Sequence, residues 1–163
     1  MAERWRAMFP DTVNEVAARL VAAVVASTAV VMLVTDAWWL LVPLAYGFVA
    51  RVVAGPRYSP LALLVTRVVV PRLPIDERPV AGSPKRFAQG IGATLSSLAL
   101  LAWIVGATGL AALLVAMIAI AATLEAALGF CLGCKLYGLL ARAGVIGDAD
   151  CPECADISLR SAR

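Results

Sequence analysis

Residues 110–141 read LAALLVAMIAIAATLEAALGFCLGCKLYGLLA, and no charged side chain interrupts this stretch before Glu125. Built as one unbroken α-helix it is about 48 Å long, because each residue adds about 1.5 Å. The hydrocarbon core of a bilayer is only about 30 Å thick. The stretch therefore predicts a membrane-spanning helix over residues 110–135. Its last turns should project beyond the lipid, and Cys131 and Cys134 should lie near that exit.

The whole chain has the composition of an integral membrane protein. It contains 163 residues, of which 62% are hydrophobic and only 15% are charged. Soluble domains are close to half apolar and a quarter charged. The apolar residues form long runs and not short alternating segments, which favours helices over a membrane barrel. These features predict an all-α integral membrane bundle.

Three further apolar runs indicate four spans in all, at about residues 13–34, 37–55, 86–107 and 110–135, within a membrane domain of residues 1–141. Thr12 and Glu15 fit a capping box for the first helix. Between the second and third spans, Ser59 and Pro60 fit a helix start, but Pro71 ends that run after about 18 Å. This segment is too short to cross, and we expect an interfacial or re-entrant helix there.

The positive charges predict the orientation of the bundle. Arginine and lysine occur before the first span, in the segment between the second and third spans, and after the fourth, whereas the two other turns contain none. With four spans, all the basic segments lie on one side, and the positive-inside rule makes that side cytoplasmic. We therefore expect both termini and all four cysteines to face the cytoplasm. The expected environment is the lipid bilayer, with no nucleic-acid partner.

The four cysteines form two C-x-x-C pairs, Cys131 with Cys134 and Cys151 with Cys154, and the chain contains no histidine. Sixteen residues separate the pairs, a spacing typical of a four-thiolate zinc site. Four thiolates leave no open position on Zn²⁺, so such a site is structural or shapes a docking surface for a partner protein. The sequence predicts a zinc clamp in which the cytoplasmic tail, residues 142–163, packs on the end of the fourth helix. In this interpretation the protein is an accessory protein and not an enzyme.

The alternative is redox chemistry, with Cys131 and Cys134 as a dithiol that exchanges with a soluble partner or with the tail pair. If the protein is an enzyme, it is then a thiol-disulfide oxidoreductase or a sulfur relay. An unbroken fourth helix places both cysteines near a helix C-terminus, where the dipole opposes thiolate formation. A third interpretation treats them as small buried apolar residues.

Glu125 is the other candidate, because an acidic side chain at membrane depth is rare and usually functional. The structural alternative is that Arg51, Arg19 or Gln89 satisfies the carboxylate inside the bundle. Proton or anion handling is the functional alternative. The sequence names no substrate for either.

Several short motifs resemble a bacterial membrane family known as a domain of unknown function, DUF4395. They are Arg57-Tyr58-Ser59-Pro60, Pro71-Arg72-Leu73, Pro84 through Gln89, and Glu125 through Cys134 with Tyr137. The resemblance implies a multi-helix protein of the bacterial inner membrane. It also implies partnership with thioredoxin-like or sulfurtransferase proteins. A separate alternative is that the protein is an accessory subunit of a larger membrane complex. The Cys151-Pro152-Glu153-Cys154 tail is similar to an extension that not all members have.

Overall fold

The computed structural model describes residues 12–55, 58–73 and 79–144, and these ranges are almost entirely helical, as predicted. Two three-residue strands, β1 (Thr12–Asn14) and β2 (Pro79–Ala81), pair antiparallel and join the starts of two helices. The helices in chain order are α2 (Glu15–Thr35), η1 (Trp38–Leu40), α3 (Leu41–Ala54), α4 (Pro60–Leu64), η3 (Val65–Val69), η4 (Val70–Arg72), α5 (Gly82–Ile104), α6 (Thr108–Leu128) and α7 (Leu132–Arg142).

Three of these helices, α2, α5 and α6, are long and apolar enough to cross a membrane. The predicted second span is present as a shorter apolar helix, Trp38–Val53, formed by η1 and most of α3. At about 1.5 Å per residue it is about 24 Å long, which is less than the thickness of the hydrocarbon. Within the described residues, length and composition therefore identify three helices that could cross a membrane, and they do not confirm the fourth predicted span.

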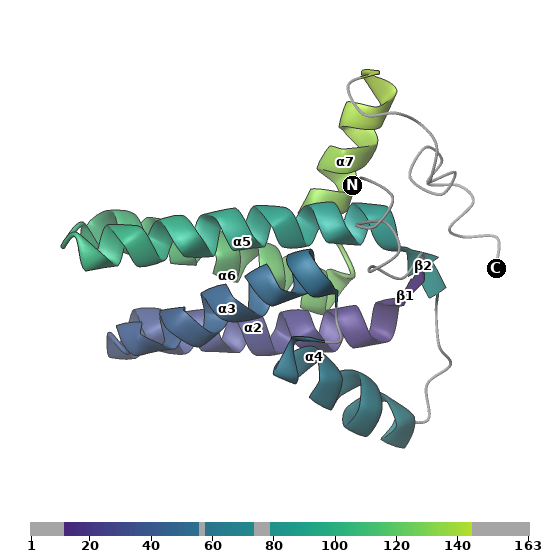
Figure 1. Cartoon of the computed structure of the whole chain (residues 1–163), viewed down its shortest axis with the longest axis horizontal. Helices are drawn as coiled ribbons and strands as arrows, with labels where there is room; N and C mark the ends of the chain where they lie inside the picture. The colour runs from purple at the N-terminus through teal and green to yellow at the C-terminus, as the bar shows by residue number, and fades with distance from the viewer. Residues whose placement is uncertain (1–11, 56–57, 74–78, 145–163) are drawn as a thin grey trace.

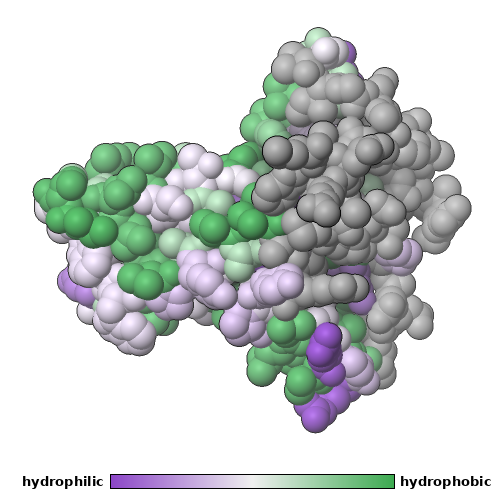
Figure 2. Space-filling model, viewed as in Figure 1, coloured by the Kyte–Doolittle hydropathy of each residue, from purple (hydrophilic) through white to green (hydrophobic). Residues whose placement is uncertain are grey.

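Helices α2, α3, α5 and α6 lie side by side as an antiparallel bundle (Figure 1). Small side chains line the contact between α2 and α6, where Ala29 of α2 and Ala111 of α6 are fully buried. Small residues let helix backbones approach closely where lipid replaces water as the solvent. The outside of the bundle carries exposed leucines, valines and isoleucines, and hydrophobic residues cover much of its surface away from α7 (Figure 2).

The contact between α3 and α5 depends on a glycine. A Cβ atom added at Gly92 would overlap Cε1 of Phe48, because it would lie closer to this atom than real Cβ atoms come to other heavy atoms. The aromatic ring of Phe48 therefore occupies the space that a side chain at position 92 would need. The missing side chain at Gly92 thus lets α3 and α5 pack closely at this point.

Replacing Gly92 by alanine is expected to destabilise the bundle by about 1–3 kcal/mol, because the Phe48 ring must leave its position. Gly90→Ala is the matched control, since nothing lies within 4 Å of a Cβ atom at that position. Alanine is the better helix former, so the control should be neutral or stabilising by up to about 1 kcal/mol. Unfolding of both variants in detergent measures the difference. Equal stability of the two variants would show that the Phe48 contact does not matter.

The helix starts agree only in part with the predicted caps. Asn14 and not Thr12 caps α2, and its Oδ1 accepts a hydrogen bond from the Val16 N–H at 2.9 Å. Ser59 caps α4 as predicted, with Pro60 at the first helical position. From there the chain stays helical to Arg72 through one π-type turn and one 3₁₀ turn.

The prediction of one continuous helix over residues 110–135 is wrong. Helix α6 ends at Leu128, and Gly129 follows in the left-handed conformation with a φ of 65°. Glycine adopts this conformation without steric penalty and often ends helices in this way. The chain then leaves the bundle axis, and α7 points away from it (Figure 1).

Candidate functional site

An arginine from the first helix completes the end of α6. The guanidinium of Arg19 donates hydrogen bonds to the carbonyl oxygens of Ala126, at 3.1 and 3.2 Å, and of Ala127, at 3.0 Å. The last carbonyls of a helix have no partners within the helix, and a cation is favourable beside them. Arg19 therefore fixes the end of α6 just before the Gly129 turn that leads to the cysteines.

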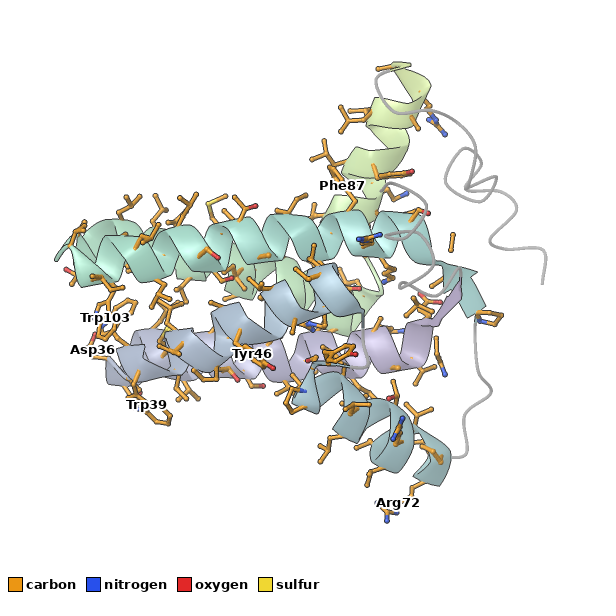
Figure 3. All side chains as sticks on the ribbon, viewed as in Figure 1. Asp36, Trp39, Tyr46, Arg72, Phe87 and Trp103 are labelled. Carbon is orange, nitrogen blue, oxygen red and sulfur yellow. The ribbon has the colours of Figure 1, made fainter. Side chains whose placement is uncertain are left out.

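Helix α7 is held firmly against the start of α5. A Cβ atom added at Gly133 would lie 2.5 Å from the Cβ of Ala88 and 2.6 Å from its Cα, so only glycine fits this contact. One turn further on, the rings of Phe87 and Tyr137 pack edge to face with their centroids 5.6 Å apart. Phe87 is labelled in Figure 3, on α5 beside the base of α7. These contacts set the position of the cysteines relative to α5.

Cys131 and Cys134 lie at the N-terminus of α7, with Cys131 as the N-cap residue. The Cys134 thiol donates a hydrogen bond to the Cys131 sulfur, with 2.8 Å between the sulfurs, and the backbone N–H of Cys134 donates to the same sulfur at 3.4 Å. Both cysteines are free thiols, and Cys131 is buried. The predicted location near a helix C-terminus is wrong, because the Gly129 break starts a new helix. The dipole of α7 therefore favours a thiolate here instead of opposing it.

The environment separates the acidities of the two thiols. The hydrogen bond from the Cys134 thiol lowers the pKa of Cys131, and the nearby charge of Lys85 acts in the same direction. The pKa of Cys134 is raised, first because its proton is held by Cys131 and second because the thiol is buried. Cys131 is therefore the thiol of the pair that ionises more readily, and Cys134 is the one that keeps its proton.

Glu125 forms an ion pair with Lys85, and the Lys85 Nζ and Glu125 Oε1 atoms are 2.5 Å apart. Lys85 is almost completely buried, and its charge also acts on both cysteines. Sequence reasoning missed this residue because it placed Lys85 in a loop before the third span. Helix α5 begins earlier, at Gly82, because a proline in the first turn, here Pro84, is compatible with a helix. The first turn of α5 thus brings Lys85 to the level of Glu125.

Among the described residues, none of the three partners predicted for Glu125 forms an ion pair or a hydrogen bond with it. Arg19 caps α6 as described above. Arg51 is buried, donates from Nε to the Gly47 carbonyl of its own helix, and lies over the Phe48 ring, although its charge still interacts with Glu125. The Oε1 atom of Gln89 is buried and has no hydrogen-bond partner among the residues that the structure describes.

The second cysteine pair, Cys151 and Cys154, lies outside the described residues, as does most of the tail over residues 142–163. Within residues 12–55, 58–73 and 79–144, no group of three or more histidine, cysteine, aspartate or glutamate side chains is placed to hold a metal ion. The two described cysteines supply at most half of the predicted four-thiolate zinc site.

One family model matches the chain, and it covers residues 13–142. Its description is "Domain of unknown function (DUF4395)". This range includes every described helix and the first cysteine pair but not the second. No curated protein and no solved structure matches the chain.

Proposed function

Because the chain belongs to the DUF4395 family, whose description names no activity, we propose a function from its own residues: a membrane dithiol that exchanges disulfides with a thioredoxin-like protein. One observation carries the proposal. The sulfurs of Cys131 and Cys134 are adjacent at a helix N-terminus and are joined by a hydrogen bond, beside the buried Lys85–Glu125 pair. A helix N-terminus and a nearby cation both favour a reactive thiolate.

The exchange starts from the oxidised pair and a reduced partner protein with two thiols. A partner thiolate attacks the sulfur of Cys134, the less buried of the two cysteines, and the Cys131–Cys134 bond breaks. Cys131 leaves as a thiolate, which the N-terminus of α7 and the charge of Lys85 stabilise. A lower pKa makes a thiol a better leaving group, so this direction of cleavage is favoured.

The second step resolves the mixed disulfide between the partner and Cys134. The second partner thiol loses its proton and attacks the first partner sulfur, and Cys134 leaves and takes up that proton. The partner ends as a disulfide, the Cys131–Cys134 pair ends as a thiol and a thiolate, and two electrons have moved. The same steps in reverse oxidise the pair. With a sulfurtransferase partner, the Cys131 thiolate would attack the outer sulfur of a persulfide on the partner. The sulfur–sulfur bond of that persulfide then breaks, a persulfide forms on Cys131, and the partner cysteine leaves as a thiolate.

In the membrane, we propose that α3 crosses together with α2, α5 and α6. It lies in the same bundle, antiparallel to α2 and α5, and the described basic residues all belong to segments at the end of the bundle where α7 begins (Figure 1). The turns at the opposite end contain Asp36 and no lysine or arginine. The positive-inside rule then makes the α7 end cytoplasmic in a bacterial inner membrane, with both chain ends on that side.

The four-thiolate zinc clamp stays as a second candidate, since the sulfurs of Cys131 and Cys134 converge on one point. At a Zn–S distance of about 2.3 Å, tetrahedral geometry separates two sulfurs by about 3.8 Å, so these two would have to move apart. Cys151 and Cys154 would have to supply the other ligands. As an accessory or docking element, such a clamp needs no exchange chemistry.

Thiol titration and metal analysis of the purified full-length protein separate the two candidates. The expected result is a disulfide between Cys131 and Cys134 that forms and breaks reversibly in a glutathione redox buffer, identified by peptide mass spectrometry. The double variant Cys151→Ser/Cys154→Ser is the control and should keep this behaviour. One zinc ion per chain that is lost in the control variant, or no disulfide between Cys131 and Cys134 in any buffer, would reject the dithiol function.

A further inference from the structure

Helix α7 has an exposed apolar stripe that no described element covers. Leu132, Leu136 and Leu139 recur at intervals of four and three residues and so lie on one face. They are 44%, 44% and 64% exposed, respectively. The opposite face packs on α5 through Gly133 and Tyr137. The helix is therefore apolar on the side that protein contacts leave open.

A basic flank runs beside this stripe. Lys135 and Arg142 are seven residues apart, two turns of helix, and lie on one side of the leucines. In the space-filling view, hydrophobic surface covers the side of α7 that faces along the bundle, toward the apolar helices (Figure 2). An apolar face with flanking lysine and arginine is typical of helices that lie in the plane of a membrane surface.

The position of α7 along the bundle agrees with this arrangement. Leu128, the last residue of the apolar helix α6, is 71% exposed, and the chain turns at Gly129 directly after it. From this turn α7 runs across the bundle axis instead of continuing along it (Figure 1). The contacts at Gly133 and Tyr137 fix this direction.

We propose that α7 is a membrane-surface helix that binds the anionic phospholipids of the leaflet at its end of the bundle. The leucine stripe enters the boundary between headgroups and acyl chains, and Lys135 and Arg142 contact the lipid phosphates. Amphipathic helices of this kind sit about 5–10 Å into that boundary. The arrangement places Cys131 and Cys134 at the headgroup level. It does not depend on what chemistry the sulfurs perform.

Tryptophan quenching in nanodiscs of phosphatidylglycerol and phosphatidylcholine tests the apolar contact. Leu139→Trp places the probe in the stripe, and Ala141→Trp, two residues on, places it on the opposite side of the helix. The wild type supplies the background of four native tryptophans. Lipids brominated close to the headgroup should quench the probe at position 139 at least about twofold more strongly than the probe at position 141, given a shallow insertion depth. Leu136→Trp repeats the test if Leu139→Trp does not fold.

Several outcomes would overturn the proposal. Quenching of the stripe probe by aqueous iodide but not by lipid bromine places α7 in water. Quenching mainly by bromine near the chain ends places α7 inside the bilayer. Equal lipid quenching of the probes at positions 139 and 141 would contradict the proposed orientation, in which only the leucine stripe of α7 faces the lipid.

Charge is tested separately, by measuring which lipids the protein retains in native mass spectrometry. Lys135→Gln/Arg142→Gln should retain phosphatidylglycerol less well, by roughly fivefold for each charge. Lys135→Arg/Arg142→Lys keeps both charges and should behave as the wild type. Equal retention by the two double variants would exclude anionic lipid as the partner of this flank. Both tests leave the cysteines intact, so their failure differs from failure of the proposed exchange.

Discussion

Replacing Lys85 by methionine is expected to destabilise the folded protein by about 3 kcal/mol, the low end of the range for breaking a buried ion pair. The variant leaves the carboxylate of Glu125 without its partner, 2.5 Å away in the wild type. Methionine fills a similar volume, so loss of packing contributes little. The low end applies because the Glu125 side chain keeps 19% of its exposure. Chemical unfolding in detergent measures the change.

The double variant Lys85→Met/Glu125→Leu should recover most of that loss, because an apolar pair of similar volume replaces both charges. Lys135→Met is the matched control, since Lys135 forms no ion pair in the described structure and contacts only the Phe130 ring by a cation–π interaction. A surface substitution of this kind changes stability by less than about 0.5 kcal/mol. If the single and double variants at Lys85 were equally unstable, the ion pair would not be the cause.

Removing the thiol hydrogen bond to Cys131 is expected to slow alkylation of Cys131 on the order of tenfold at neutral pH. A hydrogen bond to a charged group contributes about 1.5 kcal/mol, and its loss lowers the population of the Cys131 thiolate by about that factor. The comparison is between Cys134→Ser, whose hydroxyl still donates, and Cys134→Ala, which has no donor. Both are made in a chain without Cys151 and Cys154, so that only Cys131 reacts. Iodoacetamide uptake against pH gives the rates.

The pH profile gives the sign of the effect. The pKa of Cys131 is lowered, chiefly by the hydrogen bond from Cys134 and further by Lys85. The Cys134→Ser variant should therefore react as a thiolate below the usual thiol range and lose reactivity only as the pH falls through the lowered pKa. The Cys134→Ala curve should shift to higher pH. Coincident curves would mean that the sulfur at position 134 does not set the charge on Cys131.

Much of the fold was predictable because its signals are local. The long apolar runs, the cap at Ser59 and the proline after it each depend on a few neighbouring residues. The break after Leu128 was not predictable, since residues 128–131 are as apolar as the helix before them. One glycine inside a helix costs only about 1 kcal/mol. Tertiary contacts decide the turn, namely the close approach of Gly133 to Ala88 and the packing of Tyr137 on Phe87.

The candidate site was predictable only in its residue types. The C-x-x-C spacing identified Cys131 and Cys134, and the rarity of charge at membrane depth identified Glu125. Their electrostatic partner, Lys85, lies forty residues before Glu125 in the sequence, and no periodicity connects the two. The missed helix break also reversed the sign of the dipole at the cysteines. A single boundary therefore changed the expected chemistry of the pair.

The hydrogen bonds from Arg19 to Ala126 and Ala127 also order the assembly of the protein during synthesis. Each of these hydrogen bonds joins two residues that are 107 or 108 positions apart in the sequence. Helix α2 therefore enters the bilayer long before the carbonyl groups that accept hydrogen bonds from Arg19 have been synthesised. Until then the guanidinium has to reach the headgroups or water, because a charge in hydrocarbon is costly. Once α6 has inserted, the carbonyl groups at its end accept the hydrogen bonds of the Arg19 guanidinium. Helix α2 thus closes the end of α6, and the bundle is complete only when both helices have been made.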